Sequence, residues 1–116
     1  MDLMDGLKRT HDCYSLTETS LNQEVVLMGW VLRRRDHGGL IFIDLRDRKG
    51  ISQVVFAPEV HDESHQKAHS LRSEYVIAVK GIVRRRPEGM ENPKIKTGMI
   101  EVSCRDLRIL NTSKTP

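Results

Sequence analysis

The chain has 116 residues, 30% of them charged, and a formal net charge of +3. This length fits one domain that can bury a core without help from a metal or a disulfide framework. Two cysteines are too few for a disulfide framework or a four-cysteine zinc site. No apolar run approaches the roughly 18 residues of a membrane span, and the N-terminus lacks the apolar core of a signal peptide. We therefore expect a soluble, cytoplasmic protein with reduced, structural cysteines.

The first half of the chain has the composition of three strands. Residues 24–35, EVVLMGWVLRRR, are rich in β-branched and aromatic residues, and the glycine turn DHGG follows them. Residues 40–47 should return as a hairpin partner, and the turn DRKG leads to a third strand at residues 51–56. Together they predict a three-stranded meander.

The second half predicts one helix and two strands. Residues 59–73 are helix-compatible, with a thin apolar stripe formed by Val60, Ala68 and Leu71. Residues 75–86 resume strand composition and end in three arginines, residues 87–98 are a proline- and glycine-containing loop, and residues 99–110 form the last strand. Three strands, a helix and two strands is the order of the all-β, five-stranded OB-fold barrel, whose sheet face and loops bind oligonucleotides. Other small barrels share this order.

Phe42 stands on the polar side of its strand. With a period of two, Ile41, Ile43 and Leu45 form the core face, and Phe42 shares the other face with Asp44 and Arg46. A nucleobase stacked on an exposed ring recovers roughly 1–3 kcal/mol, which would explain an outward phenylalanine. The alternative is that strand twist tucks the ring under a loop as a small satellite of the core.

Arginines flank this position. Arg33 and Arg35 alternate onto one face of the first strand, so their guanidinium groups could lie beside Phe42 and bind phosphates or base edges. The alternative for the arginine run is a solvated sheet edge with ion pairs to neighbouring aspartates, and it is strongest for Arg34. The aspartates available are Asp36, Asp44 and Asp47.

Two further side chains offer base recognition. The Gln53 amide supplies a donor and an acceptor that match a uracil edge, and Glu101, out of phase with the apolar residues of its strand, could accept two hydrogen bonds from guanine. His61, His65 and His69 recur at helical spacing, but a solvated helix face is favoured over a metal site because no cysteine or ordered carboxylate accompanies them. Phosphate-binding, nucleophile-elbow and HExxH motifs are absent, so we expect no catalytic residue and no metal site.

The segment GWVLRRRDHGGLIFIDLRDRKGISQVVF, with RTHDC before it and TGMIEV after it, resembles the N-terminal anticodon-binding domain of bacterial-type aspartyl-tRNA synthetase. The resemblance covers residues 9 to about 110, and it implies an OB-fold domain at residues 1–110. Residues 111–116 would then begin a linker to an absent catalytic domain. The family is a homodimeric class II synthetase that charges tRNA(Asp) with aspartate, using ATP and Mg²⁺. The fragment itself would be non-catalytic and would need no cofactor.

The resemblance also assigns roles to residues. It places the stacking aromatic at Phe42, the uracil reader at Gln53, the anticodon arginine at Arg35 with Arg33 beside it, and a contact to the first anticodon base at Glu101.

His37 and Gly89 resemble the relaxed members of the family, which also charge tRNA(Asn), whereas members restricted to aspartate carry leucine and lysine there. The sequence therefore predicts reading of GUC and also GUU. Both residues could instead be simple turn residues. The rival functions are a stand-alone single-strand binding OB protein and a protein-interaction module.

Overall fold

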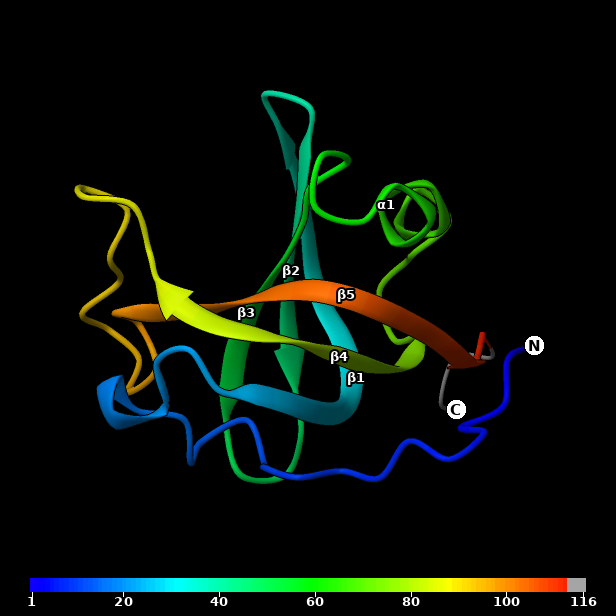
Figure 1. The fold of residues 1–116 in the computed structure, drawn as a ribbon, viewed down its shortest axis with the longest axis horizontal. Coiled ribbons are helices and arrows are strands. Elements are labelled where there is room, and N and C mark those ends of the chain that lie inside the picture. Colours follow the sequence, from blue (N-terminus) through cyan, green and yellow to red (C-terminus); the bar gives the residue numbers. More distant parts are fainter. Residues whose placement is uncertain (113–116) are drawn as a thin grey trace.

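The computed structural model describes residues 1–112. Five strands form one closed barrel in the order β1-β2-β3-β5-β4. The elements are a 3-10 turn at Glu18–Ser20, β1 at Glu24–His37, β2 at Leu40–Arg46, β3 at Ile51–Phe56, α1 at Asp62–Ala68, β4 at Val76–Arg85 and β5 at Ile100–Asn111 (Figure 1). The predicted OB-fold is confirmed, since this is the five-stranded barrel with one helix between its third and fourth strands.

The barrel closes through a short parallel contact. All other neighbouring strands pair antiparallel, whereas β3 and β5 pair parallel through Val54 with Val102 and Val55 with Ser103. The hairpin between β1 and β2 turns at Gly38 and Gly39, whose φ angles of +59° and +82° suit glycine. The predicted glycine turn is therefore present, and it fixes the register that places Phe42 opposite Arg35.

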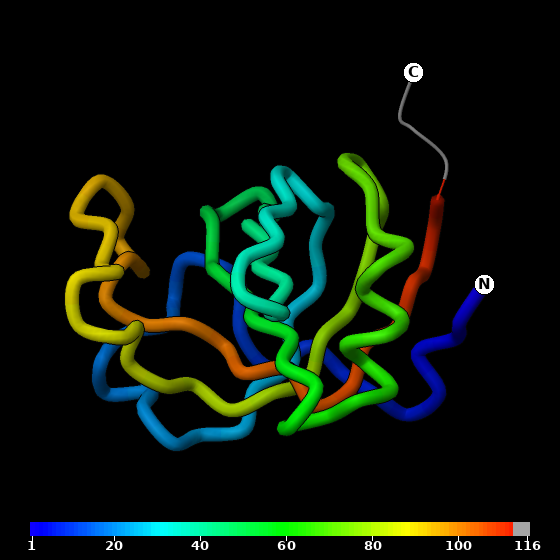
Figure 2. Tube along the Cα trace, turned by 90° about the horizontal axis from the view of Figure 1, so that it is seen from above, coloured from blue at the N-terminus to red at the C-terminus, as the bar shows by residue number. Residues whose placement is uncertain are grey.

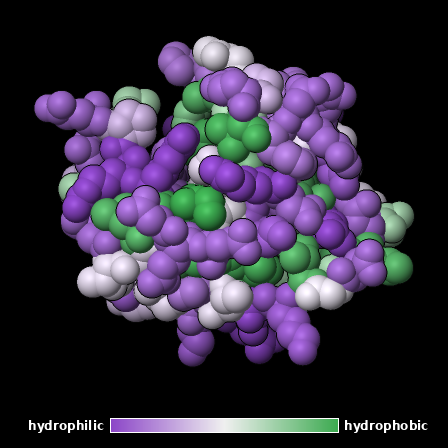
Figure 3. Space-filling view, viewed as in Figure 1, coloured by the Kyte–Doolittle hydropathy of each residue, from purple (hydrophilic) through white to green (hydrophobic). Residues whose placement is uncertain are grey.

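The core follows the alternation expected from the sequence. The core-facing residues of β2, which are Ile41, Ile43 and Leu45, are at most 1% exposed, and Phe56 at the end of β3 is fully buried. On the face of the molecule in Figure 3, hydrophilic residues predominate and apolar residues form only smaller areas. No helix in residues 1–112 has the length and apolar composition to cross a membrane.

The helix is much shorter than predicted. The sequence indicated residues 59–73, but α1 covers Asp62–Ala68, with His61 as its N-cap and His69 as its C-cap. The His61 ring accepts a hydrogen bond from the Ser64 backbone N–H, which starts the helix at that point. Leu71 is fully buried although it lies beyond the helix, so tertiary packing and not helical periodicity places it.

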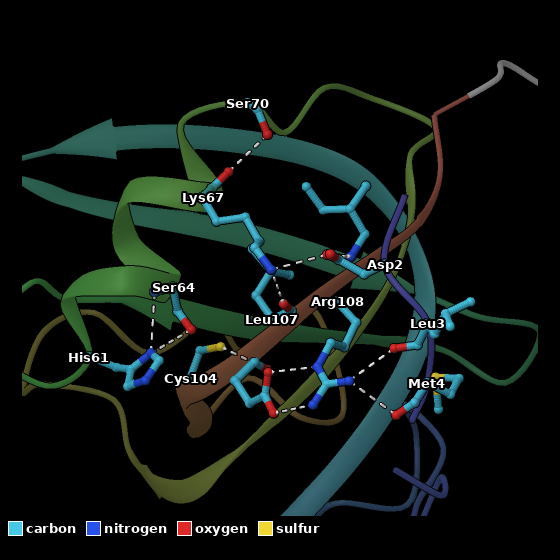
Figure 4. Close-up of polar contacts among 12 residues, drawn as sticks. Asp2, Leu3, Met4, His61, Ser64, Lys67, Ser70, Cys104, Leu107 and Arg108 are labelled. Atoms are coloured by element: carbon cyan, nitrogen blue, oxygen red, sulfur yellow. Dashed lines mark hydrogen bonds and ion pairs between the residues drawn. The ribbon is translucent and has the colours of Figure 1, made fainter. Parts of the chain in front are cut away.

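The N-terminal residues are fastened to β5 on the side where α1 packs (Figure 4). The Asp2 backbone N–H donates to the Ile109 carbonyl at 2.9 Å, and the Asp2 carboxylate accepts from the Ile109 N–H at 2.8 Å and from Lys67 Nζ at 3.1 Å. Arg108 donates to the carbonyls of Leu3 and Met4 at 2.9 and 3.2 Å. The hydrogen bond from Ile109 and the Lys67 cation hold the pKa of Asp2 below its usual value.

The last strand runs to Asn111, one residue past the predicted end of the domain at residue 110. Of the predicted linker at 111–116, residues 113–116 lie outside the described residues. The linker therefore stays a prediction.

Candidate nucleic-acid interface

A groove of about 500 Å³ lies between β1, β2, β3, β5 and the loop that joins β4 to β5. Its lining residues are Arg33, Arg35, Asp36, His37, Phe42, Asp44, Gln53, Arg86, Pro87, Met90, Asn92 and Glu101. Six of the seven residues predicted to contact RNA are in this set. In Figures 1 and 2 the β4–β5 loop stands on the side of the barrel away from α1, and no residue of α1 lines the groove. A larger hollow of about 630 Å³ beside Trp30 and Arg9 contains none of the seven.

Phe42 lies on the outward face of β2, half-buried, with Arg35 as its cross-strand partner. The Arg35 guanidinium carbon is 5.5 Å from the centre of the ring, within the range of a cation–π contact. The geometric expectation of a ring outside the core and beside a guanidinium group is met. Its role in stacking a base stays a prediction.

Gln53 and Glu101 are buried beneath the groove, at 4% and 2% exposure, and hydrogen-bond to each other. Gln53 Nε2 donates to Glu101 Oε1 at 3.0 Å, and Arg84 Nε donates to Glu101 Oε2 at 2.7 Å. Glu101 points away from the barrel interior, as its strand phase indicates, but it is not free. Its charge is compensated by Arg84, so a buried carboxylate can stand in a basic groove.

The acceptor side of Gln53 is also occupied. Its Oε1 accepts from Arg35 Nη2 at 2.8 Å and from Arg86 Nη1 at 3.3 Å. An amide nitrogen carries two donors, and one of them is used by Glu101, so Gln53 offers the groove a donor and no spare acceptor. The sequence indicated both a donor and an acceptor, and this difference arises because two arginines converge on one oxygen.

Arg86 is a groove residue that was not predicted from the sequence. It is 7% exposed, and its Nε donates to the Ile100 carbonyl at 2.9 Å. Its Nη2 is buried and has no hydrogen-bond partner within residues 1–112. Burial lowers the pKa of Arg86 and the carboxylate of Glu101 opposes that shift, but a guanidinium stays charged at neutral pH. The sequence pattern could have indicated Arg86 as a groove residue, because Arg84 and Arg86 share the outward strand phase opposite Glu101.

The first arginine run divides into two roles. Arg34 binds Asp36 through two hydrogen bonds of 2.8 Å and also donates to the carbonyls of His69 and Leu71, so it has the structural role that the alternative interpretation favoured for it. Arg33 is exposed and lines the groove, and its side chain forms neither a hydrogen bond nor an ion pair in residues 1–112. Arg35 lies 3.8 Å from Asp44 while facing Phe42.

Asp47, considered as an arginine partner from the sequence, binds backbone N–H groups instead. It accepts from Cys13 and Lys49 at 2.8 Å and from Gly50 at 3.0 Å. Burial raises the pKa of its carboxyl group, but these three donors outweigh burial and hold the pKa below its ordinary value of 3.8. Asp47 therefore fixes the β2–β3 turn to the N-terminal segment.

The two loop residues predicted to set specificity lie apart. His37 lines the groove at the β1–β2 turn. Gly89 is exposed with a φ of +86°, and it does not line the groove, although its neighbour Met90 does. The turn-residue alternative therefore has support at Gly89.

The histidines of the helix segment are occupied locally. His61 caps the helix, His65 Nε2 lies 2.8 Å from the Gly39 carbonyl oxygen, and the His65 and His69 rings contact edge to face. Residues 1–112 hold no group of three or more potential metal-binding side chains. Cys13 and Cys104 are free and buried, and burial raises the pKa of both thiols, that of Cys104 to about 12.

A closed five-stranded barrel with a basic groove on one side is the architecture of the nucleic acid binding OB-fold domains. Comparison with known proteins agrees with this class. The chain belongs to the OB-fold nucleic acid binding domains of the tRNA anticodon family, whose profile matches residues 25–110.

Similar proteins come from sequence and from structure. The chain is 61% identical over 116 residues to the aspartate–tRNA(Asp/Asn) ligase of Desulfotalea psychrophila, covering 100% of this chain but only 19% of that relative. It is 63% identical over 102 residues to the ligase of the same name from Thermodesulfovibrio yellowstonii, covering 88% of this chain and 17% of the relative. Asparaginyl-tRNA synthetase from Pyrococcus horikoshii, with asparaginyl-adenylate, superposes with a TM-score of 0.76 and 28% identity, covering 93% of this chain and 23% of that one.

Proposed function

We propose that this chain is the part of an aspartate–tRNA ligase that reads the anticodon, acting on tRNA(Asp) and tRNA(Asn) in the cytoplasm. The observation that carries the proposal is the convergence of Phe42, Gln53, Arg35 and Glu101 on one basic groove. The two relatives described above carry a name that includes both tRNAs, and at about 60% identity this supports the same substrates for the longer protein. That protein would be a homodimer and would use ATP with Mg²⁺, chemistry in which the present residues have no assigned part.

The groove can read a splayed pyrimidine in its centre. The base stacks on Phe42 beside the Arg35 guanidinium, and the free Gln53 N–H donates to a pyrimidine O4. Cytosine presents an amino donor at that position, so the same contact disfavours it. Uracil is therefore the middle base that this groove fits best.

Arg86 supplies a second donor to the bound strand. A buried guanidinium N–H without a partner costs roughly 1–3 kcal/mol, which a base carbonyl or phosphate oxygen in the groove would recover. Glu101 keeps its bonds to Gln53 and Arg84 and so positions the Gln53 donor. Glu101 also lines the groove, where its carboxylate can accept from a guanine edge.

Binding of anticodon stem-loops with GUC, GUU and unrelated triplets, measured at one salt concentration, tests this proposal. Phosphate contacts are salt-sensitive and blind to sequence, so discrimination among triplets requires the base contacts above. We expect tight binding of GUC and GUU and weaker binding of triplets without a central uracil. Equal affinity for every triplet would instead indicate a stand-alone, sequence-tolerant single-strand binder.

The relaxed reading of the third base has its own test. His37→Leu should weaken GUU binding relative to GUC, because the ring that can both donate and accept is replaced by an apolar side chain. This change is cleaner than Gly89→Lys, since a φ of +86° strains any lysine there. Aspartylation of both tRNAs by the longer protein is the matching activity assay, and failure on tRNA(Asn) would limit the substrate to tRNA(Asp).

A further inference from the structure

A second, smaller cleft of about 230 Å³ continues the outward face of β2 beyond the groove. Side chains that line it include Tyr14, Arg46, Lys49, Ile51, Ile95 and Lys96. We call it the basic cleft, because its lining residues carry three cations and no carboxylate. It shares no lining residue with the groove.

The strand pairing makes the two surfaces continuous. Phe42, Asp44 and Arg46 alternate onto one face of β2, with Asp44 opposite Gln53 and Arg46 opposite Ile51. Phe42 and Arg46 are four residue steps apart along the strand, which is about 13 Å at roughly 3.3 Å per residue. Successive bases of a stacked strand are about 3.4 Å apart, so this distance is longer than several base steps. The basic cleft therefore lies beyond a base stacked on Phe42.

The β4–β5 loop forms a wall of both surfaces. Pro87, Met90 and Asn92 line the groove, and Ile95 and Lys96 line the basic cleft. An RNA strand that lies in the groove along this loop is therefore directed toward the basic cleft.

The cations of the basic cleft are available to a ligand. The side chains of Arg46 and Lys49 form neither a hydrogen bond nor an ion pair within residues 1–112. Lys96 is held in place, since its Nζ donates to the Tyr14 carbonyl at 2.9 Å and lies 4.0 Å from the centre of the Tyr14 ring. An ammonium group has three donors, so Lys96 keeps capacity for an anion.

We propose that the basic cleft binds the sugar–phosphate backbone of nucleotides that flank the anticodon triplet, through Arg46, Lys49 and Lys96. The inference rests on the proposed function, because it extends the same bound strand past the groove. Phosphates are the ligand that fits, since the cleft offers unpaired cations. Its aromatic ring, Tyr14, is 50% exposed, but Lys96 Nζ already lies 4.0 Å from the ring centre. Such contacts add affinity and hold the register of the strand without reading its sequence.

The test uses the whole domain and a GUC stem-loop, with affinity measured over a range of salt concentrations. We expect Arg46→Gln combined with Lys96→Gln to lower the affinity several-fold and to reduce the slope of log affinity against log salt by roughly 0.7 for each lost phosphate contact. Lys94→Gln is the matched control, because this exposed lysine of the same loop lines neither surface. The ratio of GUC to unrelated-triplet affinity should not change.

The outcomes separate the two proposals. If the unsubstituted domain binds GUC selectively but the double variant has the slope and affinity of the Lys94→Gln control, the basic cleft is not a phosphate site. If the unsubstituted domain does not bind the stem-loop, the proposed function and this inference both fall. Ethylation interference gives an independent readout, since phosphates outside the triplet should lose their effect in the double variant only.

Discussion

The two phenylalanines of the chain provide a matched pair for testing the groove. Phe42 is half-buried in the groove and Phe56 is fully buried in the core, so the same change to leucine separates binding from folding. Phe42→Leu removes the stacking face, which is worth roughly 1–3 kcal/mol and corresponds to about a 5- to 150-fold loss of stem-loop affinity. Stability should fall by less than about 1 kcal/mol, the size of an exposed cation–π contact with Arg35.

Phe56→Leu should give the opposite result. A cavity in the core costs about 1–2 kcal/mol of unfolding free energy and lowers the melting temperature by several degrees, while stem-loop affinity stays within about two-fold of the unsubstituted domain. Fluorescence anisotropy with a labelled GUC stem-loop and thermal unfolding followed by circular dichroism measure the two quantities. Unchanged affinity in Phe42→Leu with a sharply lower melting temperature would mean that the ring serves the core, and the stacking argument would be wrong.

Three further predictions concern buried groups. Asp47→Ala should cost about 3 kcal/mol at neutral pH, since three backbone donors lose a charged acceptor. The pKa of Asp47 is lowered in the folded state, so its contribution to stability is complete above the ordinary pKa of 3.8 and is lost as the pH falls through the lowered pKa. Denaturant unfolding of the unsubstituted domain and of Asp47→Ala should therefore show a smaller difference in unfolding free energy at pH 3 than at pH 7. Glu101→Ala should cost roughly 2–3 kcal/mol in the same assay, because it leaves the Gln53 amide and a guanidinium without their acceptor, and it should also reduce triplet selectivity. Cys13 and Cys104 should resist iodoacetamide in the native state, because buried thiols of raised pKa hold almost no thiolate; rapid labelling detected by mass spectrometry would show that the barrel opens.

Local sequence patterns predicted the barrel well where the position of a residue depends only on its own strand or turn. The alternation around Phe42 and the glycine turn at Gly38 depend only on nearby sequence, and both are found in the structure. The helix was predicted too long, because its composition suits a helix over residues 59–73 while the His61 cap and the burial of Leu71 set its ends. Such ends depend on contacts with the barrel, which a sequence pattern does not contain.

Six of the twelve residues that line the groove were predicted, but the hydrogen bonds among them were not. Strand phase selected Phe42 and Gln53 separately, yet the bonds from Gln53 to Glu101 and to Arg86 require the parallel contact of β3 with β5. That pairing joins segments far apart in the sequence. That the Gln53 amide offers the groove a donor but no acceptor therefore follows from tertiary structure alone.

The fastening of Asp2 to Ile109 has a practical consequence for handling the domain. Because these residues bond to each other, the start of the chain and the end of β5 emerge together, on the side away from the β4–β5 loop (Figures 1 and 2). A fluorophore, a surface anchor or a fused protein joined near either position would project away from the RNA-facing wall. Immobilisation through these ends thus suits kinetic measurements in which the stem-loop must approach freely.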